Sequence, residues 1–431
     1  MSAQGNFADS RAPFLLARLP GSTRKLYHRL KREVHHMNIL FCWELGSGYG
    51  HLQPMRALAA AIRGRGGSVS GLLPEARYAE AVEAEFDTPA SVIPELVAPE
   101  GPHRRPDTWP EMLLGLGFGD PAQLSPRIDW FLAEIERRAP DALVCEHAPT
   151  ALLAARIAGV PVMAIGTGWT LPPRYEPMPV YRPALRFEDA ELLQREAPLV
   201  SAVNPLLSER GAAPLKAAAD WLEVDAGVLK TWPELDHYGE REGACYVGPI
   251  WHRRPGPAPE WPEGEGKRVF CYLKGQWRGL HSLISGFGHL PVRVLVHIDR
   301  ERDNSYAAPP NVHVSAEPVD IEQVFEQADF IVSHGGHTLT CQALLAGKPQ
   351  WLLPLHAEQE GTAWRLHRLG CGHYYTGSLG SARMARVLRR VLADEAPRQT
   401  ARSRAADLAD WHLDTAIETI VDRLADVVAR K

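Results

Sequence analysis

The sequence predicts an α/β protein with two domains, each built on a parallel sheet. Short apolar runs rich in β-branched residues alternate with helical stretches, and a segment rich in proline and glycine divides the alternation into two sets. A length of 431 residues suffices for two ordinary domains. With 45% hydrophobic and 23% charged residues, the composition is globular and excludes a disordered or collagen-like chain.

The first domain is predicted at residues 37–247, the linker at 248–266 and the second domain at 267–404. Apolar residues at helical spacing over 405–431 predict a final helix, which we expect to pack back toward the first domain. The strands are expected at 38–43, 68–73, 142–145, 161–165, 227–230 and 245–247, and then at 268–273, 292–298, 329–333 and 350–353.

Residues 1–36 form a separate basic extension, in which seven lysines and arginines stand against two acidic residues. Leu26, Leu30 and Val34 recur every four residues, which is the pattern of a basic amphipathic helix. Such a helix over 23–35 could touch an anionic membrane surface weakly, or it could be a solvated or packed appendage. The extension has a net charge of +5, whereas the whole chain has a net charge of −5. The remaining residues therefore carry −10, which does not suit binding to nucleic acid.

Cysteine usage indicates a reducing compartment, and we expect a cytoplasmic protein. The six cysteines show no C-x-x-C pair, and several lie within apolar runs, as buried free thiols do. The longest apolar runs fall short of the ~20 residues that span a bilayer. The cysteines are Cys42, Cys145, Cys245, Cys271, Cys341 and Cys371.

A glycine-rich loop follows the first strand and ends at His51. Gly46, Gly48 and Gly50 would let the backbone turn tightly and leave room for a ligand above the next helix. Their G-x-G-x-G spacing is not the dinucleotide-binding fingerprint. An imidazole at the carboxyl end of a strand could accept a proton from an approaching hydroxyl, although position alone is equally compatible with a structural histidine.

Glu146 follows the apolar run 142–145 and should lie on the same rim of the sheet as His51. A carboxylate bonded to a histidine fixes its tautomer and stabilises the imidazolium that forms on proton transfer. The alternative is an ordinary solvated loop carboxylate.

Residues 330–344 run from a strand through glycines and hydroxyls into a helix. Backbone N–H groups, the positive end of that helix, the hydroxyls of Thr338 and Thr340, and the side chain of His334 could together bind a diphosphate. The alternative is that the glycines merely turn the chain. Further on, Glu358 and Gln359 follow another strand and offer donors and acceptors for a polyol.

These segments resemble the inverting glycosyltransferases of the GT-B fold, a family that includes the macrolide, flavonoid and plant secondary-metabolite sugar transferases. The resemblance spans most of 37–372 in order and spacing. It implies two Rossmann-like domains whose sheets face each other across a cleft. The residues that carry the resemblance are Gly50-His51-x-x-Pro54, Asp141-x-x-Val144-Cys145-Glu146, and Ser333-His334-Gly335-Gly336 together with Glu358-Gln359.

The resemblance implies metal-independent transfer of a sugar from a UDP- or TDP-sugar to a small-molecule, natural-product or lipid-like acceptor. The nucleotide sugar is then a co-substrate, and no bound cofactor or metal is expected. His51 matches the general base of the family, and Glu146 stands where the family usually has an orienting aspartate. The residues matching the diphosphate site are His334, Gly335, Gly336, Thr338 and Thr340, and those matching the donor-sugar site are Glu358 and Gln359.

Several positions depart from the family pattern. Gln342 stands where a glutamate often binds the ribose, and Leu339 where a serine or glycine is usual. Residues 314–319 lack the tryptophan and glutamine that define the uracil site in plant members. Lys274 is part of a Lys-Gly-Gln segment that replaces the Gly-Ser usually found in the family after the first strand of the second domain. Lys274 could contact phosphate or be a surface lysine.

Four apolar residues of the first domain could line an acceptor pocket, although core packing explains each one singly. They are Trp109, Met112, Phe118 and Trp169. Three other functions stay open: a sugar-nucleotide epimerase or hydrolase, a non-catalytic scaffold that binds a nucleotide sugar, and an oxidoreductase, against which the glycine spacing argues.

Overall fold

The computed structural model describes residues 36–100, 105–182, 185–253, 255–299, 308–315, 317–377 and 379–430. The helix and the membrane-surface contact predicted over 23–35 lie outside the described residues. Within those ranges, no helix has both the length and the apolar character needed to cross a membrane.

The first domain holds a six-stranded parallel sheet with the strand order β3-β2-β1-β4-β5-β6. Its strands are β1 (Asn38–Trp43), β2 (Ser68–Leu73), β3 (Ser91–Val92), β4 (Ala142–Glu146), β5 (Val162–Gly166) and β6 (Ala226–Leu229). Its helices are α3 (Tyr49–Gly64), α4 (Ala76–Ala81), α5 (Trp109–Gly115), α6 (Pro121–Arg138), α7 (Pro149–Ala158) and α8 (Asp189–Glu209), with short 3₁₀ turns η1 (Ala218–Leu222) and η2 (Pro233–Leu235).

Strand β1 shows why this sheet is covered on both faces. Phe41 and Trp43 pack on the side of α3, whereas Leu40 and Cys42 pack on the side of α6 and α7. All four are buried, as expected of a strand in the middle of a parallel sheet. Alternate side chains therefore anchor helices on opposite faces, and the carboxyl ends of the strands remain free to carry polar loops.

The second domain repeats this plan with the strand order β12-β11-β10-β7-β8-β9, again parallel. Its strands are β7 (Lys267–Lys274), β8 (Val292–Asp299), β9 (Val312–Ser315), β10 (Phe330–Ser333), β11 (Gln350–Leu352) and β12 (Gly372–Tyr374). Its helices are α9 (Leu280–Phe287), α10 (Ile321–Gln327), α11 (His337–Leu345), α12 (Ala357–Arg368), α13 (Ser381–Ala393) and α14 (Ala396–Asp407). The predicted fold class of two parallel-sheet α/β domains is thus confirmed.

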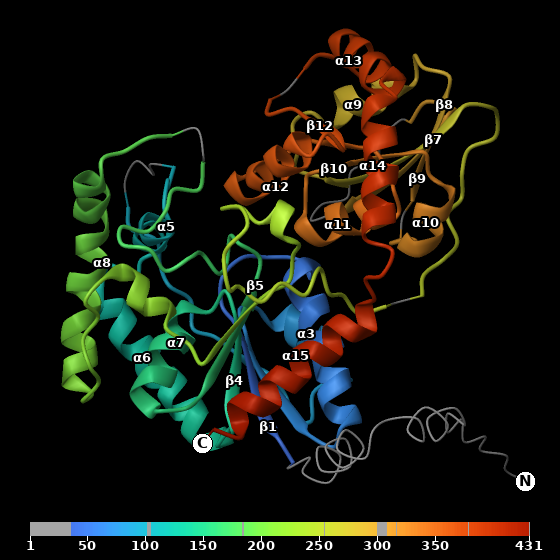
Figure 1. Cartoon of the computed structure of the whole chain (residues 1–431). Coiled ribbons are helices and arrows are strands. Elements are labelled where there is room, and N and C mark those ends of the chain that lie inside the picture. Colours follow the sequence, from blue (N-terminus) through green and yellow to red (C-terminus); the bar gives the residue numbers. More distant parts are fainter. Residues whose placement is uncertain are drawn as a thin grey trace, which may run out of the picture.

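The chain ends in α15 (Leu413–Val428), which crosses back and packs on the first domain beside α3 (Figure 1). Ile420 and Leu424 are buried there in the same core as Phe41 of β1. The return of the C-terminal helix is confirmed, but the single helix expected over 405–431 is interrupted. Helix α14 ends at Asp407 and α15 begins at Leu413, and between them the indole Nε1 of Trp411 donates to the carbonyl of Val247 at 2.7 Å.

The expected strand over 245–247 forms only an isolated bridge, between Tyr246 and Leu229. Strands β3, β9 and β12 were not predicted from the sequence. They lie at the edges of their sheets and are two to four residues long.

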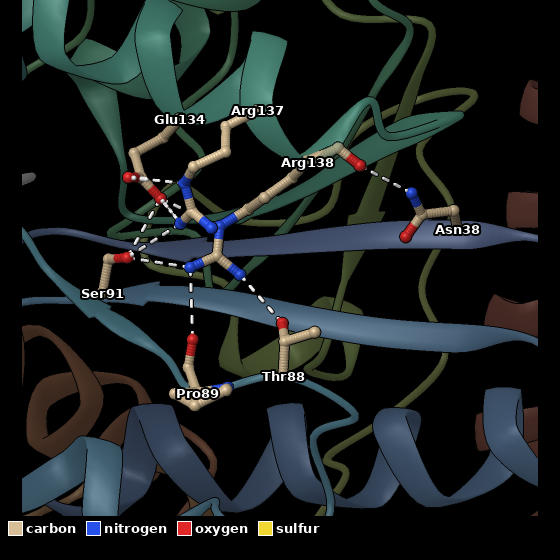
Figure 2. Close-up of polar contacts among 7 residues, drawn as sticks. All are labelled: Asn38, Thr88, Pro89, Ser91, Glu134, Arg137 and Arg138. Atoms are coloured by element: carbon tan, nitrogen blue, oxygen red, sulfur yellow. Dashed lines mark hydrogen bonds and ion pairs between the residues drawn. The ribbon is translucent and has the colours of Figure 1, made fainter.

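A polar network ties the end of α6 to the β3 edge of the first sheet (Figure 2). The Arg138 guanidinium donates to Glu134 at 2.9 Å, to Ser91 at 2.8 Å and to the hydroxyl of Thr88 at 3.1 Å. The side-chain amide of Asn38, at the start of β1, donates to the carbonyl of Arg138 at 2.8 Å. The guanidinium of Arg138 therefore fixes the helix against the edge of the sheet, and the carbonyl of Arg138 fixes it against the central strand β1.

The two domains meet between the segment after η2 and helix α12. His237 Nε2 donates to the carbonyl of Glu358 at 3.0 Å, and the Arg365 guanidinium donates to the carbonyl of His237 at 3.0 Å. A β-carbon built on Gly361 would lie only 2.6 Å from the His237 ring, so the close approach depends on that glycine. The contact positions the start of α12 against the first domain.

Candidate active site

The loop between β1 and α3 has a backbone that only glycine adopts readily. Gly46 and Gly48 have φ values of +90° and +97°. The N–H of Leu45 donates to the carbonyl of His147 at 3.0 Å, and the N–H of Gly48 donates to the hydroxyl of Tyr78 at 2.7 Å. The loop is thereby tied to the end of β4 and to α4.

This loop leads to His51, whose Nδ1 lies 3.1 Å from Oε1 of Glu146. The pairing follows from the sheet, because β1 and β4 are neighbours and Trp43 lies opposite Glu146 in their register. The Trp43 ring also stacks on the imidazole, with centroids 5.1 Å apart. Since a carboxylate only accepts hydrogen bonds, Nδ1 carries the proton and Nε2 is left with a lone pair. The His51 side chain is 12% exposed.

A lysine that sequence reasoning missed completes this group. Lys230, just beyond β6, forms an ion pair with the same Oε1 of Glu146. Burial alone would raise the pKa of Glu146, but the charge of Lys230 and the hydrogen bond from His51 outweigh burial and lower that pKa. Glu146 is therefore a buried, ionised carboxylate shared by two cation-forming side chains.

Glu44 is a second buried carboxylate and lies beneath the loop. It accepts bonds from Arg127 of α6 at 2.8 and 3.0 Å and from the N–H of Thr150 at 2.7 Å, the latter at the start of α7. The side chains of Arg127 and Glu44 are 6% and 0% exposed. It holds the beginning of the loop against the two helices that cover the opposite face of the sheet.

His147 follows Glu146 and has a left-handed φ of +47°. Burial, with added repulsion from His51, lowers the pKa of its imidazole to about 3, so the ring is neutral. Its Nε2 is buried without a hydrogen-bond partner. The ring lies beside His51, with centroids 6.4 Å apart, and it lines a hollow together with Trp109, Leu152 and Thr170.

The four residues predicted for an acceptor pocket belong to one hydrophobic cluster of the first domain. Trp109 lines the hollow beside His147. Phe118 is fully buried against Trp221, and Met112 packs on the same core. Trp169 stacks on Tyr181 with centroids 3.8 Å apart. Core packing thus accounts for Phe118, and only Trp109 of the four borders this hollow.

In the second domain, both ring nitrogens of His334 are bound by the backbone. Nδ1 donates to the carbonyl of Leu353 at 2.7 Å, and Nε2 accepts from the N–H of Lys274 at 2.9 Å. Burial lowers the pKa of His334 to about 4, and Lys274 and His356 repel its charged form. In this arrangement the neutral ring joins the ends of β7, β10 and β11 and has no nitrogen left to donate to a phosphate.

The diphosphate site expected at α11 retains a helix end that no side chain caps. Gly336 is the exposed N-cap residue, and no side-chain hydrogen bond caps the helix. The preceding Gly335 has a φ of +81°. Free N–H groups at such an end attract anions. Thr338 is half-buried there, but Thr340 is fully buried and its hydroxyl has no partner. The prediction that Thr340 contacts a diphosphate is therefore not supported by its position.

The other predicted donor residues lie on β7, α11 and α12. The Lys274 ammonium pairs with Asp299 at the end of β8. Glu358 and Gln359 occupy the first turn of α12, where the Gln359 side chain accepts from the N–H of Leu355 at 2.9 Å. Gln342 is half-buried on α11.

His356, at the start of α12, connects the two halves of the site electrostatically. Desolvation lowers the pKa of His356, Glu358 partly offsets this effect, and repulsion from His51 and Lys274 lowers the pKa further. His356 also repels the charged form of His334. His356 therefore lies near enough to His51 of the first domain and to His334 of the second domain for its charge to act on both. Over the described residues, no group of three or more His, Cys, Asp or Glu side chains could hold a metal ion.

Residues 281–422 match the family described as "Erythromycin biosynthesis protein CIII-like, C-terminal domain". The chain is 33% identical over 156 residues to the NDP-glycosyltransferase YjiC of Bacillus subtilis, a match covering 33% of this chain and 38% of that protein. It is 27% identical over 284 residues to a PGL/p-HBAD biosynthesis glycosyltransferase of Mycobacterium tuberculosis, which covers 61% of this chain and 66% of that protein. The chain thus spans less than two thirds of either relative.

The similarity in three dimensions extends over nearly the whole chain. The crystal structure of the glycosyltransferase VinC in complex with dTDP superposes with a TM-score of 0.66 at 17% identity, covering 92% of this chain and 100% of VinC. Such low identity shows a shared fold. The chain thus has the GT-B fold, and its residues 281–422 are similar in sequence to the C-terminal domains of erythromycin CIII-like proteins.

Proposed function

We propose that the protein transfers a hexose from a TDP- or UDP-sugar to a hydroxyl of a natural-product or lipid-like acceptor, with inversion at the anomeric carbon. The observation that carries this proposal is the His51–Glu146 pair at the end of the first sheet, together with the uncapped start of α11 in the second domain. The similarity to erythromycin-type proteins and to VinC with its bound dTDP favours a TDP-sugar and a natural-product acceptor.

The proposed reaction is a single displacement. The acceptor hydroxyl gives its proton to Nε2 of His51 while its oxygen forms a bond to the anomeric carbon. Glu146 stabilises the resulting imidazolium through Nδ1. General-base assistance of this kind contributes typically ~10²–10⁴-fold.

On the donor side, the bond between the anomeric carbon and the diphosphate oxygen breaks. Backbone N–H groups at the start of α11 stabilise the charge that develops on the leaving diphosphate. Since His334 has both nitrogens bound by the backbone, its proposed contribution is to fix this loop. Glu358 and Gln359 are proposed to hold the sugar hydroxyls, and Gln342 the ribose. Because the helix end supplies the positive charge, we expect activity to survive a metal chelator.

The test begins with thermal unfolding in the presence of UDP, TDP and their sugar conjugates. A ligand at ~100 times its Kd adds about 2.7 kcal/mol to the free energy of unfolding. The stabilising sugar nucleotide is then incubated with an acceptor panel, and the configuration of the product is read by NMR. Release of nucleotide only when acceptor is present supports transfer, whereas equal release without acceptor would indicate a hydrolase. If no nucleoside diphosphate stabilises the protein, the proposal is wrong.

A further inference from the structure

Lys230 is a buried cation next to the proposed base. Its side chain is 6% exposed, and its backbone N–H is fixed by a 2.8 Å bond to the carbonyl of Gly166, at the end of β5. The ammonium pairs with Oε1 of Glu146, the same oxygen that lies 3.1 Å from Nδ1 of His51. One carboxylate oxygen therefore stands between a lysine and a histidine.

Four other titratable side chains lie near these three residues. His147 directly follows β4, and His356 at the start of α12 lies near enough to His51 for their charges to interact. His337 of α11 is buried, and the charge of Lys230 is among the causes that lower the pKa of His337. Tyr78 of α4 packs on Trp43, which stacks on His51. The neighbouring imidazoles all resist protonation, so Lys230 is a buried positive charge beside Glu146 that does not depend on them.

The shared oxygen determines what Glu146 does to His51. A carboxylate bonded to a histidine stabilises the imidazolium. Lys230 withdraws part of that stabilisation by binding the same oxygen, and its own charge repels an imidazolium. The balance between Glu146 and Lys230 therefore decides how readily the ring accepts the proton of the acceptor.

We propose, as an addition that rests on the proposed function, that Lys230 is a positioning residue that holds Glu146 in place and extends the activity of His51 to lower pH. Lys230 takes no part in the transfer of the proton. The proton of the acceptor passes to Nε2 of His51 and from there to solvent, and no bond to Lys230 forms or breaks.

The test compares Lys230→Gln and Lys230→Arg with the unchanged protein in full pH profiles of kcat/KM for the acceptor. Glutamine can still donate a hydrogen bond to Glu146 but carries no charge, so the acidic limb should move to higher pH by about one to two units. Arginine should restore the limb to its original position. Lys216→Met, a change at an exposed lysine, is the matched control and should leave the profile unchanged.

Two readouts separate this role from a purely structural one. At pH values above the acidic limbs of both proteins, Lys230→Gln should approach the kcat/KM of the unchanged protein. Its KM for the donor should stay the same. If the acidic limb does not move in Lys230→Gln while the variant is folded, the role of Lys230 is refuted. If Lys230→Gln does not fold, a normal acidic limb in Lys230→Met under stabilising donor would refute the role equally, and a raised limb would support it.

The proposed function is tested separately by His51→Ala in the same assay. Full activity of His51→Ala would overturn both proposals. Loss of activity in His51→Ala together with an unmoved limb in Lys230→Gln would overturn only the role of Lys230.

Discussion

A β-carbon built on Gly46 would lie 2.6 Å from Nε2 of His51, the nitrogen that Glu146 leaves unprotonated. Gly46 therefore does more than permit a turn, because any larger residue would press on the atom proposed to accept the proton. No heavy atom lies within 4 Å of the corresponding position at Gly48, although both glycines have positive φ values. The two positions share the same backbone requirement and differ in what a side chain would meet.

Gly46→Ala should accordingly lose turnover by about 10²-fold or more, because its methyl group displaces or covers Nε2. Gly48→Ala is the matched control. Both variants should lose about 1–3 kcal/mol of stability through backbone strain, measured by urea unfolding. Equal turnover in the two folded variants would contradict the blocking of Nε2.

His51→Ala should reduce kcat by ~10²–10⁴-fold and leave the affinity for the nucleoside diphosphate unchanged, because the base contacts the acceptor only. Calorimetric titration with TDP and UDP checks the affinity. A parallel loss of diphosphate binding would show that the ring supports the donor site instead.

Gly336→Asp should abolish diphosphate binding without harming the fold. Gly336 has φ −57° and ψ 128°, which an aspartate adopts freely, and a β-carbon there meets nothing within 4 Å. Aspartate is a favourable N-cap residue, but its charge would occupy the N–H groups and repel an anion. The unliganded Tm should stay the same or rise while the shift caused by TDP disappears. Gly336→Ser, a neutral cap, is the control and should keep more of that shift.

Two neighbouring arginines of α6 should differ sharply in their contribution to stability (Figure 2). The Arg138 side chain is 5% exposed and bonds to four groups, whereas the Arg137 side chain is 57% exposed. Arg138→Met should cost about 2–3 kcal/mol, because the half-buried Glu134 and Ser91 lose their donor. Arg137→Met should cost at most about 1 kcal/mol, as for other exposed ion pairs. Denaturant titration distinguishes them, and equal costs would contradict the role of the buried network.

Acid should destabilise the protein in part through His147. Its pKa is about 3 in the folded chain against an ordinary 6.5, mainly because of burial. Above pH 6.5 the ring is neutral in both states, and below it only the unfolded chain takes up the proton. The free energy of unfolding should therefore fall between about pH 6 and 4, by ~1.4 kcal/mol per pH unit for this ring.

His147→Asn isolates this contribution, since asparagine tolerates the left-handed φ of +47°. The stability of the variant should fall less steeply over the same pH interval, measured by urea unfolding at several pH values. Parallel curves for the two proteins would refute the assignment.

The fold could be predicted largely because its central strands are apolar on both faces. Phe41 and Cys42 are adjacent in sequence and both buried, a pattern that identifies a strand covered by helices. The edge strand β3, Ser91–Val92, carries no such pattern. It forms because its backbone pairs with β2. No run of apolar residues in the neighbouring sequence indicates that pairing.

The pairing of His51 with Glu146 was foreseeable, since both were expected at carboxyl ends of strands on one rim. Lys230 was not, because a lysine after an apolar run ordinarily reaches into solvent, and its partner lies 84 residues away. Thr338 and Thr340 show another limit. Residues two apart on a helix point in nearly opposite directions, so a pair of hydroxyls at that spacing cannot both face one ligand.

The hydrogen bond from His237 to the carbonyl of Glu358 connects the first domain directly to the segment proposed to recognise the sugar. If the two domains separated, that bond would break and the His237 ring would leave its close contact with Gly361. The proposed recognition of the donor sugar is thus coupled to the distance between the two domains. A domain movement that made room for a bulkier acceptor would also move the residues proposed to contact the sugar.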